Sequence, residues 1–370
     1  MSGVRPPSIP PGLDTPRLVV DLDVVERNVA RLQAAMDERG VRLRPHAKTH
    51  KSVRIARLQL AAGARGITVG TLGEAEVMAD GGIDDLFIAY PVWAEGSKAE
   101  RLRALHDRPD VRISVGIDSE AGVEHLAATV AGSSRSLVVL VEVDSGGRRT
   151  GRSEPAEILA VARAARQAGL VVDGVFTHGG HSYRDPEAGP GAAVDEVRAL
   201  GDAAAALEQD GFTIRSVSAG STPTAMRSAT GRVNEIRAGT YVLGDRQQLA
   251  LGAAPPDGLA AFVAATVVSV SGDGRVVFDA GAKALTKDRA EFLDGFGLLP
   301  AYPDLVITAV YDYHGVARVP PGAVAPALGE VVAIVPNHVC PVVDLFDDLV
   351  TIRAGSAPQT WPVDARGRSG

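Results

Sequence analysis

Short apolar runs alternate with amphipathic stretches from Thr15 to Asp245. Runs such as "DLFIAY", "VRISVGI" and "SLVVLVEVD" are typical of buried strands, and apolar residues recur at helical spacing between them. The rhythm starts with residues 17–23 as a strand and 24–40 as a helix that ends at Gly40. Close to eight strand–helix units over about 230 residues predict a (β/α)8 barrel. A doubly wound open sheet is the competing architecture, because periodicity does not say whether a sheet closes.

The pattern changes after Asp245. Runs such as "LAAFVAATVVSVSG" and "GEVVAIVPNHVCPVV" are rich in Val, broken by Gly, Pro and Asp, and show little helical spacing. We therefore predict a barrel over residues 14–250 and a mainly-β domain over residues 251–365, with residues 1–13 packed on the β domain. The "AAPPDG" segment (253–258) is the predicted linker.

Composition narrows the possible partners. The chain has 370 residues, a net charge of −7 and 4% aromatic residues, without a Lys/Arg block. Nucleic acids and anionic membranes require a concentrated basic patch, so neither is the expected partner. No run approaches the ~20 apolar residues of a membrane-spanning helix, and none resembles a signal peptide. The single cysteine, Cys340, forms no intramolecular disulfide and fits a reducing compartment, so we expect a cytoplasmic protein.

The segment "RLRPHAKTHKS" (42–52) holds the first candidate for chemistry. If it is a strand, alternation places His46, Lys48 and His50 on one face near the strand's end. A nucleophilic lysine must lose its proton, and cationic neighbours such as Arg44 and Lys51 favour that loss. Taken alone, such a segment is more often a solvated basic loop.

Loops after later predicted strands offer groups that bind an anionic ligand. In "EVDSGGRRTGRS" (142–153), glycines permit a tight backbone and Arg149 can donate to an oxygen of a bound aromatic cofactor. Loops after the last two strands are the usual phosphate site of such barrels. Glycine N–H groups and hydroxyls follow those strands at Gly220, Ser221, Thr222, Gly239 and Thr240. Each segment alone also fits an ordinary turn or helix cap.

A metal-binding pair is predicted near the C-terminal end. In "PNHVCPVVDLFD" (336–347), His338 and Cys340 are two apart and share a face if the segment is a strand. Imidazole and thiolate together suit Zn²⁺, and a pair of ligands leaves positions open for water or substrate. A buried cysteine beside a hydrogen-bonded histidine is the alternative.

The order of these motifs resembles the D-threonine aldolase / D-serine dehydratase family, within the alanine-racemase-like, fold-type III pyridoxal-phosphate enzymes. The resemblance runs from about residue 14 to 350 through "DTPRLVVDLDVVERNV", "RPHAKTHKS", "DSGGRRTG", "HGGHSY", "SAGSTPT", "NEIRAGTYV" and "PNHVCPVVDLFD". The segments "RPHAKTHK" and "PNHVC" are its most specific parts.

The resemblance implies a (β/α)8 barrel followed by a β domain, in a homodimer with active sites at the subunit interface. It implies that Lys48 forms a Schiff base with pyridoxal 5'-phosphate, that Arg149 contacts the ring side, and that His181 and Tyr183 lie near the cofactor and substrate, with His181 catalytic. The five glycine, serine and threonine residues named above would hold the phosphate. His338 and Cys340 would bind a divalent metal, Zn²⁺ or Mn²⁺. One departure is "DYHG" (312–315), where the family leads us to expect an acidic residue directly before the histidine.

The activity implied is that of a metal-dependent lyase on D-3-hydroxy amino acids. Aldol cleavage to glycine and an aldehyde is the first prediction, and β-elimination to a 2-oxo acid and ammonia is the alternative. A racemase needs a second base and no metal, so the His-x-Cys pair argues against it. A non-catalytic pyridoxal-phosphate carrier usually lacks the β domain.

Overall fold

The computed structural model describes residues 4–370, which fold into two compact units. The barrel unit comprises residues 32–48, 53–239 and 367–370. The β unit comprises the residues up to 31, 49–52 and 240–366. The chain therefore passes from one unit to the other directly after Lys48 and again directly after Gly239.

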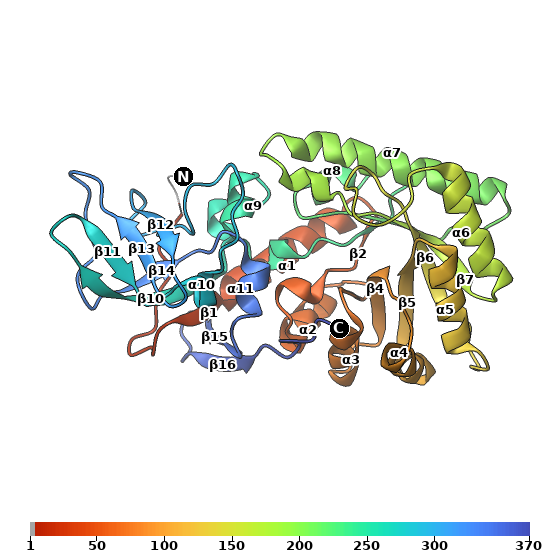
Figure 1. Ribbon diagram of the computed structural model, residues 1–370, viewed down its shortest axis with the longest axis horizontal. Helices are drawn as coiled ribbons and strands as arrows, with labels where there is room; N and C mark the ends of the chain where they lie inside the picture. The colour runs from red at the N-terminus through yellow and green to blue at the C-terminus, as the bar shows by residue number, and fades with distance from the viewer. Residues whose placement is uncertain (1–3) are drawn as a thin grey trace. The chain divides into compact units, whose positions relative to one another are not determined.

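Eight parallel strands form the sheet of the barrel unit, in the order β2-β9-β8-β7-β6-β5-β4-β3. They are β2 (Arg42–Leu43), β3 (Ile67–Val69), β4 (Asp85–Pro91), β5 (Arg112–Ile117), β6 (Val138–Glu142), β7 (Val171–Phe176), β8 (Ser216–Ala219) and β9 (Glu235–Ile236). Figure 1 shows β4 and β5 of this sheet side by side. A parallel bridge between His46 and Thr68 joins the segment after β2 to β3. The two ends of the sheet therefore meet, which confirms the predicted barrel architecture.

Helices follow the strands as the apolar spacing predicts. They are α1 (Leu22–Asp37), α2 (Val53–Ala61), α3 (Leu72–Asp80), α4 (Ser97–Asp107), α5 (Glu120–Val130), α6 (Pro155–Gln167), α7 (Ala188–Gln209) and α8 (Ala225–Ser228). Side-chain caps fix where two of them begin: Thr71 accepts the Glu74 N–H at 3.0 Å, and Ser119 accepts the Gly122 N–H at 3.3 Å. In residues 4–370, none of the helices combines the length and apolar character that crossing a bilayer requires.

An aromatic cluster fills the middle of the barrel. Phe87, Leu140 and Phe176 form it, and the two phenylalanine rings meet edge to face at 5.0 Å. Gly116 of β5 makes room for this contact, since a Cβ there would lie 2.6 Å from Cζ of Phe176. The strands are thus held around a packed core, with polar groups left at its two ends.

The β unit is built on a second sheet, in the order β12-β13-β11-β10-β1-β15-β16, with β14 also paired to β10. Its strands are β1 (Arg17–Asp21), β10 (Ala261–Val270), β11 (Arg275–Phe278), β12 (Val306–Val310), β13 (Gly315–Arg318), β14 (Val331–Ile334), β15 (Asp348–Ile352) and β16 (Gln359–Pro362). Val4, Ile9 and Leu13 pack against its core. Of the segment 1–13 that was expected to pack here, residues 1–3 lie outside the described part of the chain.

The first strand differs from the prediction. The pattern of residues 17–40 matches a strand–helix unit of the barrel, but β1 pairs antiparallel with β10 and parallel with β15. A buried strand followed by an amphipathic helix has the same pattern in either sheet, so local spacing did not reveal the partner. The second sheet thus includes a strand from the opposite end of the chain.

Five short helical segments complete the β unit: η3 (Thr240–Val242), α9 (Arg246–Ala250), η4 (Pro256–Gly258), α10 (Ala282–Leu285) and α11 (Val339–Val343). His338 directly precedes α11, and Cys340 lies in its first turn. The prediction that this pair lies on a strand is therefore wrong. The Val-rich run that suggested a strand ends at Ile334, where β14 ends.

Candidate active site

Lys48 lies in a one-turn 3-10 helix, η1 (Ala47–Thr49), that follows β2. The predicted alternation is wrong beyond Leu43, because Pro45 has no N–H for a regular ladder and the chain turns after His46. The ring of His46 stabilises the turn: its Nδ1 accepts the Lys48 N–H at 3.3 Å. In the β unit, Nδ1 of His50 likewise accepts the Ser52 N–H, at 3.1 Å. Both rings therefore support local turns.

The side chain of Lys48 is half-buried and, in residues 4–370, makes no hydrogen bond or ion pair. His178 lies just beyond the end of β7, and its pKa depends on the charges around it. Burial lowers the pKa of His178 well below 6.5, and the positive charges of Lys48, Arg149 and Arg237 lower it further. The barrel unit thus brings the predicted Lys48 and Arg149 together with two residues that the sequence patterns did not single out.

Arg237 is the second of these residues. Its guanidinium is buried, donates to Oγ of Ser218 at 2.8 Å and to the Thr177 carbonyl at 2.6 Å, and stacks on the rings of Phe87 and Phe176. Burial lowers its pKa to about 10, despite nearby carboxylates. The sequence feature that could have identified Arg237 is its position between two apolar residues, Ile236 and Ala238, at the end of a predicted strand.

Arg149 lies in an exposed loop whose backbone is held by hydrogen bonds to the Asp144 side chain. Oδ1 of Asp144 accepts the N–H groups of Gly146 at 2.8 Å and Arg148 at 3.0 Å. Gly151 has a φ of +92°, and a Cβ there would lie 2.9 Å from the Asp144 nitrogen, so only glycine fits. The predicted role of these glycines in a tight turn agrees with this geometry.

Glu142 ends β6 beside this loop. Its carboxylate is buried, Thr150 donates to one oxygen at 2.8 Å, and the other oxygen has no hydrogen-bond partner among residues 4–370. Burial raises the pKa of Glu142, while the Thr150 hydrogen bond and the charge of Arg149 lower it. A buried, half-satisfied carboxylate marks a place where a polar ligand group can bind.

A buried carboxylate from α7 joins the loops that carry the remaining barrel-unit candidates. Oε1 of Glu196 accepts the Gly179 N–H at 2.8 Å and the Gly220 N–H at 3.2 Å. Oγ of Ser221 lies 2.9 Å from Oγ of Ser182 and 3.0 Å from Oγ1 of Thr224. The predicted phosphate loop and the "HGGHSY" loop are therefore fixed to each other.

Three other predicted residues, Thr222, Tyr183 and His181, belong to these two loops and have different neighbours. Thr222 is buried next to Ser221. The Tyr183 ring lies 6.3 Å from that of His178, and Nε2 of His181 lies 3.3 Å from Oδ2 of Asp195. Tyr183 thus neighbours the cation cluster, while His181 lies beside Asp195 of α7 and close to Gly146, where a Cβ would be 3.4 Å from Cε1 of the ring.

The barrel-unit groups fit pyridoxal phosphate chemically. An amine without an ion pair can bond to the aldehyde, an exposed arginine can donate to the ring side, and the Ser221 and Thr222 hydroxyls with adjacent glycine backbone suit a phosphate.

The metal-binding candidates belong to the β unit. Nδ1 of His338 lies 2.7 Å from Oδ2 of Asp288. Burial lowers the pKa of His338, but hydrogen bonds to Asp288 and Cys340 raise it to about 10. The Cys340 sulfur lies 3.3 Å from Oγ1 of Thr49 and 3.8 Å from Oγ1 of Thr240.

Imidazole and thiol in mutual contact fit Zn²⁺, and a carboxylate on the second ring nitrogen is the usual orienting partner of a metal-binding histidine. In this protein the orienting carboxylate is that of Asp288. Asp288 was not predicted from the sequence, where we expected an acidic residue in the "DYHG" segment instead. Within residues 4–370, no group of three or more His, Cys, Asp or Glu side chains forms a complete metal site.

Comparisons with known proteins cover both parts of the chain. Residues 20–247 match the alanine racemase N-terminal domain, and residues 260–352 match a putative serine dehydratase domain. The D-threo-3-hydroxyaspartate dehydratase of Delftia sp. (strain HT23) is 36% identical over 94% of this chain and 97% of its own length. The D-threonine aldolase of an Arthrobacter species is 36% identical over 98% and 97%. The crystal structure of a D-threonine aldolase from Filomicrobium marinum superposes with a TM-score of 0.85, at 32% identity over 96% of both chains.

Proposed function

Because the chain belongs to the D-threonine aldolase / D-serine dehydratase family of fold-type III pyridoxal-phosphate lyases, we propose that it cleaves D-3-hydroxy amino acids to glycine and an aldehyde. The observation that carries the proposal is the half-buried Lys48 amine, which has no ion pair in residues 4–370 and lies among cationic groups. Such an amine is available to react with an aldehyde.

The predicted cofactor-binding residues would together hold pyridoxal phosphate, with Tyr183 lying near it. Lys48 would carry the aldehyde carbon, and Arg149 would donate to an oxygen on the ring. The phosphate would be held by Gly220, Ser221, Thr222, Gly239 and Thr240. The bound cofactor supplies an electron sink for the breaking bond at Cα. Arg237 and Glu196 keep the surrounding loops in place through the hydrogen bonds described above.

Aldol cleavage requires a base for the β-hydroxyl proton. His181 is the predicted base, and its contact with Asp195 would orient the ring. His178 is the second candidate, because its low pKa keeps the ring neutral at physiological pH. Replacing each by Gln separates them: the base is the residue whose loss lowers kcat without lowering cofactor occupancy.

His338 and Cys340 would hold the divalent metal, which supplies a Lewis acid for the substrate hydroxyl. Two solved variants of a D-threo-3-hydroxyaspartate dehydratase support this pair. A histidine and a cysteine, two residues apart, have each been replaced by alanine in that enzyme, and the cysteine variant is described in the metal-free form. We expect a chelator, Cys340→Ala or His338→Ala to remove bound metal while the cofactor stays bound, which elemental analysis and the visible spectrum measure separately.

Dehydration is the second candidate reaction. The His-x-Cys spacing at 338–340 equals the spacing of the two positions replaced in that dehydratase. In this reaction Lys48 would remove the α-proton and the hydroxyl would leave, giving a 2-oxo acid and ammonia.

Product identification decides between the two reactions. Protein loaded with pyridoxal phosphate and Zn²⁺ or Mn²⁺ is incubated with D-threonine. Glycine with acetaldehyde establishes aldol cleavage, and ammonia with 2-oxobutanoate establishes dehydration. Formation of L-threonine alone contradicts both and indicates a racemase. Lys48→Ala protein, treated identically, controls for contaminating activity.

Two further properties are proposed for this chain. The family implies a homodimer with active sites at the subunit interface, and the single cysteine supports a cytoplasmic location. Light scattering of the purified holoenzyme at several concentrations tests the first.

A further inference from the structure

A polar cavity of about 280 Å³ lies at the amino ends of the barrel strands. Its walls come from β2, β4, β5, β6, β7, β8 and β9, with Phe87 and Leu140 of the aromatic cluster among the lining side chains. The candidate residues Arg149, His178 and Ser221 instead follow the carboxyl ends of their strands. This cavity is therefore distinct from the site of the proposed lyase reaction.

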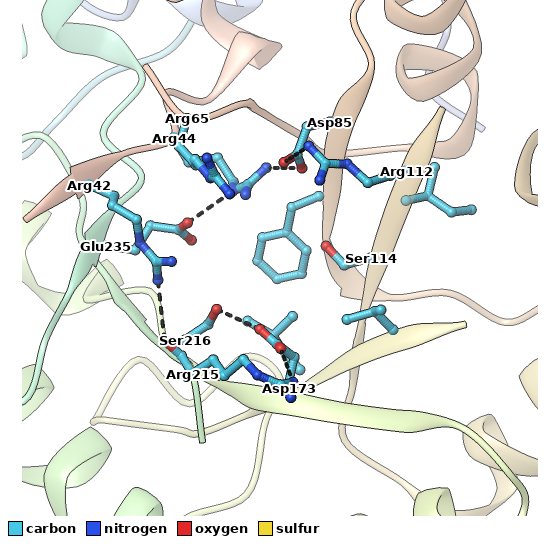
Figure 2. Close-up of a pocket in the computed structure, with 14 residues that line it drawn as sticks. Arg42, Arg44, Arg65, Asp85, Arg112, Ser114, Asp173, Arg215, Ser216 and Glu235 are labelled. Carbon is cyan, nitrogen blue, oxygen red and sulfur yellow. Dashed lines mark hydrogen bonds and ion pairs between the residues drawn. The ribbon is translucent and has the colours of Figure 1, made fainter. Parts of the chain in front are cut away.

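Arginine dominates the lining. Figure 2 shows guanidinium groups around the opening, and the lining contains Arg42, Arg44, Arg65, Arg112 and Arg215. The acidic side chains are Asp85, Asp173 and Glu235. Five positive charges thus face three negative ones, and the cavity keeps two positive charges in excess.

The acidic oxygens are already occupied. Asp85 accepts from Arg44 at 2.6 Å and from Arg112 at 3.2 Å. Asp173 accepts from Arg215 at 3.1 Å and from Ser216 at 2.7 Å.

Glu235 is satisfied in the same way: its two oxygens accept from Arg44 at 3.0 Å and from Ser218 at 2.7 Å. Each of these carboxylate oxygens is therefore already engaged by an arginine or a serine.

Two arginines retain their charge without a carboxylate partner. Arg42 donates to the Asn234 side chain and to the main-chain oxygens of Asn234 and Arg215, all of them neutral. Arg65 makes no side-chain hydrogen bond or ion pair with residues 4–370.

The depth of the charges is graded. The side chain of Arg44 is 12% exposed, whereas those of Arg112 and Arg215 are 66% and 63% exposed. The exposed guanidinium groups of Arg112 and Arg215 give an anion an entrance to the cavity. Planar guanidinium groups pair with the oxygens of phosphate and carboxylate two at a time.

We propose that this amino-end cavity binds a small oxyanion with at least two negative charges, held by Arg42 and Arg65. The two sources of that chemistry are inorganic phosphate and a di- or tricarboxylate. Because such an anion would bind the folded protein and not the unfolded chain, it should stabilise the fold by an amount that grows with the logarithm of its concentration.

The test uses the pyridoxal-phosphate-loaded protein, so that the cofactor's own phosphate site is filled. Phosphate, citrate and succinate are titrated by calorimetry and by thermal unfolding, against sodium chloride of equal ionic strength. We expect a saturable calorimetric isotherm and a concentration-dependent rise in Tm with at least one oxyanion, and neither with chloride. The preferred oxyanion, phosphate or carboxylate, identifies the source.

Arg65→Ala is the diagnostic variant, since it removes no side-chain hydrogen bond or ion pair among residues 4–370. It should weaken anion binding by about tenfold or more, and Arg65→Glu should abolish it. Arg318→Ala removes an exposed arginine of β13 and the same charge, and should bind as the wild type does.

Absence of saturable binding to the wild-type protein overturns the proposal, as does unchanged affinity in Arg65→Ala. The readout needs no turnover, so failure of the proposed lyase reaction leaves it intact.

Discussion

The two ends of the barrel unit both gather positive charge but use it differently. At the amino end, Arg44 lies between Asp85 and Glu235, and those two carboxylates neutralise it, whereas Arg42 donates only to neutral groups. At the carboxyl end, Lys48 and Arg149 have no ion pair among residues 4–370, and their charges bear on the neutral ring of His178. Paired charges stabilise the barrel, while unpaired ones remain available to react with or bind a ligand.

The largest effect is expected from removing the unpaired amine. Lys48→Ala should lower kcat by about 10³-fold or more, because both the covalent attachment and a proton carrier are lost. The same variant should lose the visible absorption of the covalently bound cofactor. Lys98→Ala, on α4, is the matched control and should keep both. Full activity in Lys48→Ala contradicts the contrast between the two ends.

At the amino end the expected effect is on stability instead. Arg44→Met leaves Asp85 and Glu235 without their central partner, and Glu235 is buried. Breaking a buried pair in this way costs about 3 kcal/mol, measurable by urea unfolding. The double variant Arg44→Met/Glu235→Gln should recover part of the loss. No recovery indicates that the arginine acts through packing alone.

A smaller effect, on the pH dependence of folding stability, is expected from His178. Its pKa in the folded protein lies below the unfolded value of 6.5, so folding favours the neutral ring. The stability this gives is complete above pH 6.5 and is lost as the pH falls below it, by up to about 1.4 kcal/mol per pH unit. Between pH 7 and pH 5, His178→Gln should therefore lose less stability than the wild type. Parallel curves refute this assignment.

The smallest effect is expected at the rim of the amino-end cavity. Arg112 shares Asp85 with Arg44, but its side chain is 66% exposed. Arg112→Ala should therefore cost less than about 1 kcal/mol in chloride buffer, and the difference should shrink further at high salt. A cost equal to that of Arg44→Met means that exposure does not separate the two arginines.

Particular residues show what the sequence could predict. The spacing of strands and helices predicted the barrel. Lys48 and Arg149 lie after their strands as expected, because the position of a loop residue relative to the preceding strand can be read from the local sequence. The partner of β1 is set by pairing with β10 and β15, which no local pattern encodes. His178, Glu196 and Asp288 matter through contacts with residues distant in sequence, so they carried no signal of their own. The arginines at strand starts look like ordinary solvated residues until the barrel brings them together.

The central claim is that Lys48 carries the cofactor, and the chain's five lysines make a direct test possible. Holoenzyme is treated with borohydride, which fixes pyridoxal phosphate to the lysine that holds it, and the modified peptide is sequenced by mass spectrometry. The account predicts modification at Lys48 and none at Lys51, whose amine is paired with Asp344 at 3.0 Å. Modification at Lys51, Lys98, Lys283 or Lys287 in place of Lys48 would contradict it.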